Sequence, residues 1–489
     1  MMQSSMRTDK QKQAGHGATP RAEYVTLAIV CAVALAVRLT AYLVVASHDP
    51  ECMMAPDTPS YENTALAFLE TGRLAVSPDQ PDLPQTIRTP GYPAFIALIY
   101  AVVGQDRTAV VIVQMVLSVA TVAAMYWLTR TVGFPRCALL VVVLAALDVV
   151  SFVYCQILLA ETLFTFLLVV GAIGGARALV DQQPKAGWVV LLGVALALGT
   201  LVRPISYYLV VPVAIGFFVV GTVTRRTLMA RLTTVSLILL PSLVLVGGWQ
   251  LRNRLVTGSA EFTHIRGLNL LFCTGADIVA RRDGISLDEA RAKLDAEVPG
   301  HEPWLMWVGT YNTDDGQPAE LCALYERKGL ELVRQHPWLA IKGSVISIAR
   351  LLFEPGERGF SGQMKIAESE TGPGGDIARL SIAAYADKWL GRYPVRFAVF
   401  VFASGYLMLL YAAGAYAAVY LWRKKRHQIA THILLWGIVL YLALLSGSIA
   451  AYSRFRCPIM PFLAMYGGIG LHTLATTLRT RRRTEPKAA

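Results

Sequence analysis

Long runs of apolar residues, separated by short polar segments, dominate the chain. The first run covers residues 24–46, which is longer than the apolar core of a signal peptide, so we interpret it as a retained membrane anchor. Nine further runs approach or reach the roughly 20 residues that a membrane-crossing helix needs. They lie near 107–129, 137–155, 160–180, 187–202, 205–222, 232–250, 394–422, 429–449 and 457–476. The pattern predicts an all-α polytopic membrane protein with about ten to twelve spans.

Two weaker apolar segments follow a different pattern. Residues 90–104 contain an apolar stretch that is too short to cross a bilayer. Residues 338–353 carry Lys342 and Arg350 at helical spacing, which makes this segment amphipathic. We predict that both segments are helices at the outer membrane surface. If 338–353 crosses the membrane instead, the topology requires one more span.

The same pattern divides the chain into five parts. The membrane module contains an outer loop at 47–106 that carries candidate catalytic residues. We also expect helices at 286–298, where Ser286 and Glu289 suit a capping box, and at 318–336. The five parts are a cytoplasmic leader (1–23), an N-terminal membrane module (24–250), a large and mostly helical outer loop (251–393), C-terminal spans (394–476) and a basic cytoplasmic tail (477–489).

Charge is distributed unevenly between the two sides that these spans define. Lysine and arginine gather in the leader, in the short loops of one side and in the tail, whereas the first outer loop is acidic. Short loops rich in these residues stay in the cytoplasm, so the loops at 47–106 and 251–393 are expected outside. The net charge of +12 therefore reflects topology. We expect no nucleic-acid partner, because the sequence has no basic, aromatic-rich soluble module.

The seven cysteines form no metal-binding pattern, since no CxxC occurs and the histidines are scattered. The sequence therefore indicates no required cofactor, and it does not point to a divalent metal. Cys273 and Cys322 share the large outer loop, where an oxidising compartment would allow a disulfide between them. The sequence leaves open whether they pair.

Charged residues at membrane depth are the strongest functional signal, because such groups usually line a cavity or pair with one another. Structural alternatives exist for each of them. An arginine at a helix end often anchors at the interface, Glu161 can cap its helix, and Asp57 can form an Asx turn before Pro59. We expect Asp148 to pair with an arginine. Acidic and basic residues nevertheless converge on the outer membrane boundary. They are Arg38, Asp57, Arg88, Asp148, Glu161, Arg203, Arg252, Arg254, Arg454 and Arg456.

Several arginines beside a carboxylate suit the chemistry of a phosphate-bearing lipid. Guanidinium groups meet phosphate oxygens bidentately, and they stabilise a phosphate that gains charge as it leaves. A hydroxyl acceptor also needs a base within hydrogen-bond reach. Asp57 is expected in that role, because Pro56 and Pro59 restrict the backbone on either side of it.

An ordered set of motifs then carries a family resemblance. Beyond Asp57 and Tyr61 in the first outer loop, the motifs are RTPGYPAF, LLAETLFTFLL, LVRPISYYLVVP, GGWQLRNRLVTGSAEF and SRFRCPIMPFLAMYGGIGL. Over about 24–270 and 430–475 the chain resembles bacterial membrane glycosyltransferases of the GT-C superfamily, especially the protein mannosyltransferases and the aminoarabinose transferase that modifies lipid A. The resemblance implies a GT-C-like helix bundle. It also implies inverting transfer of a sugar from a polyprenyl-phosphate carrier to a hydroxyl of a glycan, lipid or protein, on the periplasmic face of a bacterial inner membrane.

The resemblance also implies roles for individual residues. Asp57 would be the catalytic base, and Glu161 would match a second acidic position that helps to bind acceptor or donor. Many relatives carry acidic pairs or metal-binding partners, whereas Glu161 has no neighbouring carboxylate in sequence, so we expect no obligatory metal. Donor binding is expected of Arg203 first, and also of Arg88, Tyr61, Tyr92, Arg252, Arg254 and Arg456.

Two other functions remain open at this point. A transporter or flippase of lipid-linked sugars would also use arginines in a membrane cavity, although alternating access usually leaves internal repeats, and the sequence shows none. A glycan polymerase or ligase of related fold would use lipid-linked donors as well. The sugar, the acceptor and the carrier length are not specified by the sequence.

Overall fold

The computed structural model describes residues 20–181, 185–298, 318–366, 381–424, 428–447 and 451–484. Most of the predicted leader, residues 1–19, and the end of the predicted tail, residues 485–489, lie outside the described residues. Within the described ranges the chain is almost entirely helical, and the β-type contact there is an isolated bridge between Ala75 and Pro84. The predicted all-α class is confirmed.

Seven of the described helices are long and apolar enough to cross a membrane, so the chain is a multi-span membrane protein. In lipid a helix satisfies its own backbone hydrogen bonds, which is why such runs fold this way. The seven are α2 (Pro20–Ala46), α5 (Arg107–Thr131), α8 (Glu161–Val180), the unit of η2 (Pro204–Ser206) and α10 (Val210–Val223), α11 (Leu228–Thr257), α21 (Pro394–Lys424) and α22 (Ile429–Gly447). Shorter apolar helices are α4 (Gly91–Val103), α9 (Ala186–Val202), and η1 (Pro135–Cys137) with α6 (Ala138–Ala146).

The span predicted at 137–155 is wrong as a single helix. The chain breaks after α6 and resumes as α7 (Val149–Tyr154). Asp148 causes the break, because its carboxylate accepts hydrogen bonds from the backbone N–H groups of Val150 and Ser151, the second at 2.7 Å. Asp148 therefore caps a helix, and it is not the arginine partner that the sequence led us to expect.

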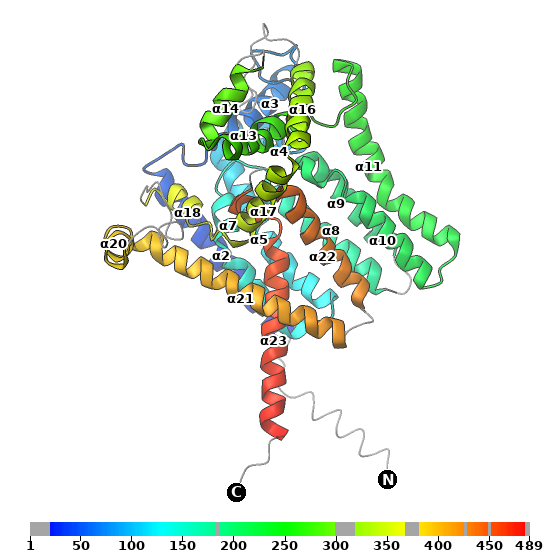
Figure 1. Cartoon of the computed structure of the whole chain (residues 1–489). Helices are drawn as coiled ribbons and strands as arrows, with labels where there is room; N and C mark the ends of the chain where they lie inside the picture. The colour runs from blue at the N-terminus through cyan, green and yellow to red at the C-terminus, as the bar shows by residue number, and fades with distance from the viewer. Residues whose placement is uncertain are drawn as a thin grey trace, which may run out of the picture.

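A layer of short helices covers one end of the bundle (Figure 1). Its own apolar core includes Leu268, Leu271, Leu294 and Tyr325. Helices predicted at 286–298 and 318–336 are confirmed, and Ser286 forms the predicted capping box with Glu289. We call this layer the outer layer; it comprises α3 (Thr58–Thr71), α12 (Ile265–Asn269), η3 (Leu270–Gly275), α13 (Ala276–Asp283), α14 (Leu287–Ala296) and α16 (Pro318–Gln335).

The two cysteines of the large outer loop do not pair in the structure. Cys273 lies in η3 and Cys322 in α16, and both are buried free thiols. The helix before η3, α12, approaches α16 closely at Gly267, where a Cβ would clash with the backbone oxygen of Cys322. Small size at that position lets α12 and α16 pack backbone against backbone.

Helix α17 (Pro337–Phe353) connects the outer layer with the bundle. It packs against α13, α22 and η7 (Ser453–Arg456). Trp338, Ile341 and Val345 are exposed along it, as expected of the amphipathic helix predicted at 338–353. The chain continues through α18 (Glu357–Gln363), α20 (Ile382–Ala386) and η5 (Asp387–Arg392), and α23 (Met460–Thr484) is the last helix.

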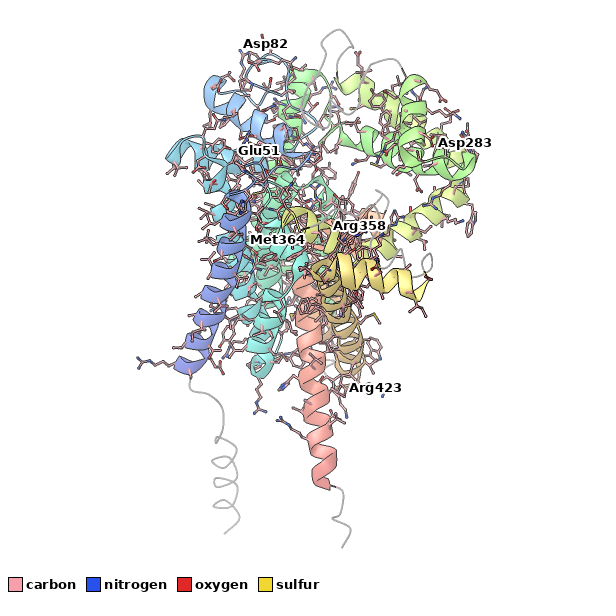
Figure 2. All side chains as sticks on the ribbon, turned by 90° about the vertical axis from the view of Figure 1, so that its left-hand side faces the viewer. Glu51, Asp82, Asp283, Arg358, Met364 and Arg423 are labelled. Carbon is pink, nitrogen blue, oxygen red and sulfur yellow. The ribbon has the colours of Figure 1, made fainter. Side chains whose placement is uncertain are left out.

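The two ends of the molecule differ as the charge pattern predicts. Figure 2 shows Asp82 and Asp283 at the end that carries the outer layer, whereas Arg423 lies toward the opposite end. Helix α2 begins and α23 ends at that opposite end (Figures 1 and 2). The acidic first outer loop and the outer layer therefore share one end of the bundle.

A close helix contact fixes the first outer loop on the bundle. A Cβ at Gly91, the first residue of α4, would lie 2.7 Å from the carbonyl carbon of Leu201 and 2.8 Å from the backbone nitrogen of Val202. Only glycine allows this approach. Because Arg88 precedes the contact and Arg203 follows it, Gly91 sets the position of one arginine relative to the other.

Candidate active site

A cavity of about 1150 Å³ lies between the bundle and the outer layer. Its walls come from the start of α3, from η2, η7 and η3, and from α14. The residues that line it include Asp57, Tyr61, Arg88, Arg203 and Arg454. Four of these belong to the predicted site, and they come from segments far apart in sequence.

Asp57 stands at the N-cap of α3, with Pro59 in the first turn. Its side chain makes no cap hydrogen bond, so the alternative of an Asx turn does not apply. Both carboxylate oxygens are instead used by arginines. Oδ1 accepts from Nη2 of Arg88 at 2.8 Å, and Oδ2 accepts from Nη1 of Arg454 at 2.8 Å.

Glu161 is the first residue of α8 and is fully buried. Its Oε1 accepts from Nη1 of Arg203 at 3.0 Å and also from Nε of Arg454. Glu161 does not line the cavity. It therefore holds two arginines from behind and makes no contact with the space in front of them.

Together these contacts form a continuous series of ion pairs, which we call the ion-pair chain: Arg88, Asp57, Arg454, Glu161 and Arg203. Their side chains are between 0% and 16% exposed, so water screens them only weakly. The ion-pair chain contains three cations and two anions, which leaves an excess of one positive charge at the cavity wall.

The ion-pair chain controls the proton affinity of Asp57. Burial alone raises the pKa of the Asp57 carboxyl, but the guanidinium groups of Arg88 and Arg454 outweigh burial and hold this pKa well below its usual value. Asp57 is thus an ionised carboxylate with both oxygens engaged. Each oxygen still has a further lone pair, but the lowered pKa makes Asp57 a weak base in this arrangement.

Arg88 is positioned by neighbours in its own loop. Its Nε donates to Oγ of Ser60 at 2.7 Å, and its guanidinium carbon lies 4.7 Å from the centre of the Tyr61 ring. The backbone N–H of Arg88 donates to Oε1 of Gln85 at 2.9 Å, and the Gln85 amide donates in turn to Thr64 at 2.8 Å. Tyr61 therefore supports an arginine at the cavity wall, as well as lining the cavity itself.

Four other residues predicted for donor binding do not line the cavity. Arg252 donates to the backbone oxygens of Leu74 at 2.7 Å and Gln85 at 2.8 Å. Arg254 donates to the backbone oxygen of Gly258 at 2.9 Å. Arg456 and Tyr92 are buried. Arg456 donates to the backbone oxygens of Leu351 and Leu352, and the hydroxyl of Tyr92 donates to Oε1 of Gln114. All four act as structural supports in this arrangement.

The motif that contains Arg252 positions one wall of the cavity. Nε1 of Trp249 donates to the backbone oxygen of Phe262 at 3.0 Å, and Nδ2 of Asn253 donates to that of Glu261 at 2.8 Å. Both acceptors belong to a segment that lines the cavity. The motif thus contributes by holding that segment against α11.

Arg454 is the central residue of the site, whereas the sequence pattern led us to expect phosphate binding by Arg456. The two belong to η7, a short 3₁₀ helix with three residues per turn. Residues two positions apart on such a helix point in different directions, so only one of them can face the cavity. If the Ser-Arg-Phe-Arg segment is interpreted as a 3₁₀ turn, its spacing predicts that the two arginines point in different directions.

The described residues contain no group of three histidine, cysteine, aspartate or glutamate side chains that could hold a metal ion. Around Asp57, the positions that a cation would take are filled by guanidinium groups. The residues present therefore fit an anion at this wall of the cavity better than a metal.

The family comparison bears on the same residues. Residues 84–249 match the family described as dolichyl-phosphate-mannose-protein mannosyltransferase. This range includes Arg88, Glu161 and Arg203, whereas Asp57 and Arg454 lie outside it. The match confirms the predicted resemblance to the protein mannosyltransferases of the GT-C superfamily. No curated protein matches the sequence significantly.

The chain also aligns with solved structures, at TM-scores below 0.5 and at 13% identity or less. The apo oligosaccharyltransferase of Archaeoglobus fulgidus has a TM-score of 0.49 at 10% identity, over 94% of this chain and 51% of its own. AglB of the same organism, in complex with an inhibitory peptide and a dolichol-phosphate, has a TM-score of 0.49 at 11% identity. The alignment covers 96% of this chain and 53% of AglB. ArnT from Cupriavidus metallidurans, bound to undecaprenyl phosphate, has a TM-score of 0.37 at 13% identity. The alignment covers 91% of this chain and 78% of ArnT. The chain thus spans about half the length of the archaeal enzyme.

Proposed function

We propose that the protein is an inverting glycosyltransferase that moves a sugar from a polyprenyl-phosphate carrier to a hydroxyl group of an acceptor. The observation that carries this proposal is the ion-pair chain at the cavity wall, of which three members lie in the range that matches the mannosyltransferase family. The description of that family names a sugar donor linked to a lipid phosphate.

The donor phosphate would bind where the ion-pair chain meets the cavity. A sugar linked to a lipid through one phosphate carries a single negative charge, and the ion-pair chain has one excess positive charge to offset it. Arg88, Arg203 and Arg454 line the cavity and can meet phosphate oxygens in pairs. When the carbon–oxygen bond to the sugar breaks, the phosphate keeps the electron pair, and the same guanidinium groups stabilise the added charge.

Asp57 would act as the base once the donor is bound. The phosphate competes for the guanidinium groups of Arg88 and Arg454, and any shift of one of them frees an oxygen of Asp57 and raises its pKa. The acceptor hydroxyl then attacks the sugar carbon from the side opposite the phosphate. A new carbon–oxygen bond forms, and the hydroxyl proton passes to Asp57. Donor binding thus activates a base that is masked beforehand.

The position of the site suits a substrate anchored in a bilayer. The cavity lies where the membrane-spanning helices meet the outer layer, so a lipid carrier can keep its tail in the membrane while its phosphate reaches the arginines. We place this end on the periplasmic side of a bacterial inner membrane, because lysine and arginine gather in the loops of the other end. We also propose that transfer needs no divalent metal, since three arginines supply the charge that a metal would.

One assay tests the proposal and its transporter alternative together. Purified protein in lipid vesicles is incubated with a panel of polyprenyl-phosphate sugars, and release of the free carrier phosphate is measured beside movement of intact donor between leaflets. Carrier release from at least one donor is expected. Movement of intact donors with no carrier release from any of them would contradict the proposal and favour a flippase.

A further inference from the structure

The cavity has a second polar end, formed by the outer layer. Along α14, Asp288, Arg291, Ala292 and Asp295 line the cavity. Their spacing of i, i+3, i+4 and i+7 is that of one face of a helix. Further lining residues come from α12 and η3. We call the following residues the polar wall: Arg266, Asn269, Thr274, Asp288, Arg291 and Asp295.

The fold fixes the direction in which this wall points. On the other face of α14, Ala290 and Leu294 are buried in the core of the outer layer, and the capping box at Ser286 secures the helix start. Arg291 is held by two hydrogen bonds, from Nε to the backbone oxygen of Phe272 at 3.2 Å and from Nη1 to Asp288 at 3.1 Å. The Arg291 side chain is therefore held in place before any ligand arrives.

The part of this end that η3 forms is irregular in a way that is common at binding sites. Residues Leu270–Gly275 of η3 form a π-helical turn, and such turns occur frequently at functional positions. Cys273 and Thr274 of this turn line the cavity. The turn thus presents side chains to the cavity beside α14.

The charge of the second end differs from that of the ion-pair chain. Two arginines (Arg266 and Arg291) and three carboxylates (Glu261, Asp288 and Asp295) line it, so it does not favour another phosphate. The amide of Asn269 and the hydroxyl of Thr274 add neutral donors and acceptors. Donors and acceptors in such a mixture suit a neutral ligand that is rich in hydroxyl groups.

Aromatic residues also line the cavity. Phe262 and Phe272 both line the cavity, and the Phe262 ring lies 5.0 Å from that of Tyr207, centre to centre. Flat apolar rings pack against the C–H faces of a sugar ring, while carboxylates and guanidinium groups bind its hydroxyls. The volume of about 1150 Å³ also exceeds the roughly 300–1,000 Å³ of a typical small-molecule site, which leaves room for two ligands.

We propose that the acceptor is a saccharide, held in the cavity against α14 and η3 by the polar wall, with its hydroxyl directed toward Asp57. This inference rests on the proposed glycosyltransferase function and adds the acceptor class. A peptide would usually bind to exposed strand edges or in a long groove, and the described residues form no strand to extend. A lipid acceptor would need an apolar channel at this end, whereas three of the four residues of α14 that line the cavity are charged.

The test compares acceptors and variants in the same carrier-release assay. The acceptors are neutral oligosaccharides of two to four sugars, serine- and threonine-containing peptides, and a short glycolipid. The variants are Arg291→Ala and Asp295→Asn in the polar wall, Arg203→Ala in the ion-pair chain, and Asp283→Asn as the matched control, because Asp283 is at the end of α13 and does not line the cavity. Thermal melting of each variant verifies that it is folded.

We expect an oligosaccharide to accept sugar and the two polar-wall variants to raise its KM about tenfold to a hundredfold, as for lost hydrogen bonds to charged groups. The KM for the donor should change with Arg203→Ala instead, and Asp283→Asn should match the wild type. The inference is overturned if a peptide or glycolipid accepts sugar and no oligosaccharide does, or if folded polar-wall variants keep the wild-type acceptor KM. Failure of the proposed function itself is a separate result, because no donor would then release its carrier.

Discussion

Nη1 of Arg454 donates to Oδ2 of Asp57 at 2.8 Å, although 397 residues separate the two in sequence. Asp57 precedes α3 in the first outer loop, and Arg454 lies in η7, just before the last helix. The contact therefore joins the two ends of the membrane domain at the cavity wall. Because Arg454 also binds Glu161, one guanidinium links both buried carboxylates of the site.

Arg203 should contribute to donor binding. Replacing Arg203 by alanine removes a guanidinium that lines the cavity, so we expect the KM for the donor to rise about tenfold to a hundredfold. Arg254→Ala is the matched control, because Arg254 donates to a backbone oxygen at the end of its own helix and lies outside the cavity. Initial rates over a donor series measure both. Equal donor KM values for the two variants would remove Arg203 from the donor site.

Arg454 should be irreplaceable by lysine. Lysine keeps the charge, but its single ammonium cannot reproduce the planar fork that donates from Nε to Glu161 and from Nη1 to Asp57. We expect Arg454→Lys to lose one charged hydrogen bond, worth about 1.5–3 kcal/mol of the free energy of unfolding, and to lower the apparent melting temperature. Arg254→Lys should melt like the wild type. An unchanged melting temperature in Arg454→Lys would show that the bridge is not needed.

Stability should depend on pH through Asp57. The folded-state pKa of this carboxyl lies below its unfolded value, so its ion pairs stabilise the fold fully above the usual aspartate pKa of about 4. That contribution is lost as the pH falls from about 4 through the lower folded-state pKa. Thermal melts of the wild type and of Asp57→Asn between neutral and acidic pH test this. The variant should show a weaker loss over that range, and parallel curves would contradict the assignment.

Chelation should leave transfer intact. The oxygens of Asp57 are occupied by two arginines, and three guanidinium groups supply positive charge for the phosphate, so no metal is needed in the proposed mechanism. We expect carrier release in excess EDTA to equal that in buffer alone. Abolition of carrier release by EDTA and its recovery with added magnesium or manganese would show that the arginines are not sufficient.

Much of the architecture could be predicted from apolar periodicity, because a long apolar run has few alternatives to a spanning helix. Runs at 24–46 and 107–129 correspond to α2 and α5, and the capping box at Ser286 identified the start of α14. The run at 137–155 was different. Asp148 interrupts this run by capping a new helix through hydrogen bonds to the local backbone. In the sequence, however, one polar residue leaves the run apolar enough to resemble a membrane span.

The site was only partly predictable, since a sequence does not reveal what each arginine meets. Asp57, Arg88, Glu161 and Arg203 do come together. Arg252 and Arg456 were equally good candidates by residue type, but each finds backbone oxygens that only the folded chain places beside it. The polar wall on α14 had no motif, because its residues face the cavity through the packing of Ala290 and Leu294 on the other side.

The most direct test of the proposed mechanism is the effect of Asp57→Asn on carrier release. Asparagine keeps the shape of the side chain but cannot take the proton of the acceptor hydroxyl, so kcat should fall about 10²–10⁴-fold while the donor KM stays the same or decreases. Asp82→Asn is the control, since Asp82 is an exposed aspartate of the same loop, paired with an exposed Arg73. A folded Asp57→Asn variant that releases carrier at the wild-type rate would contradict the central claim that Asp57 is the base.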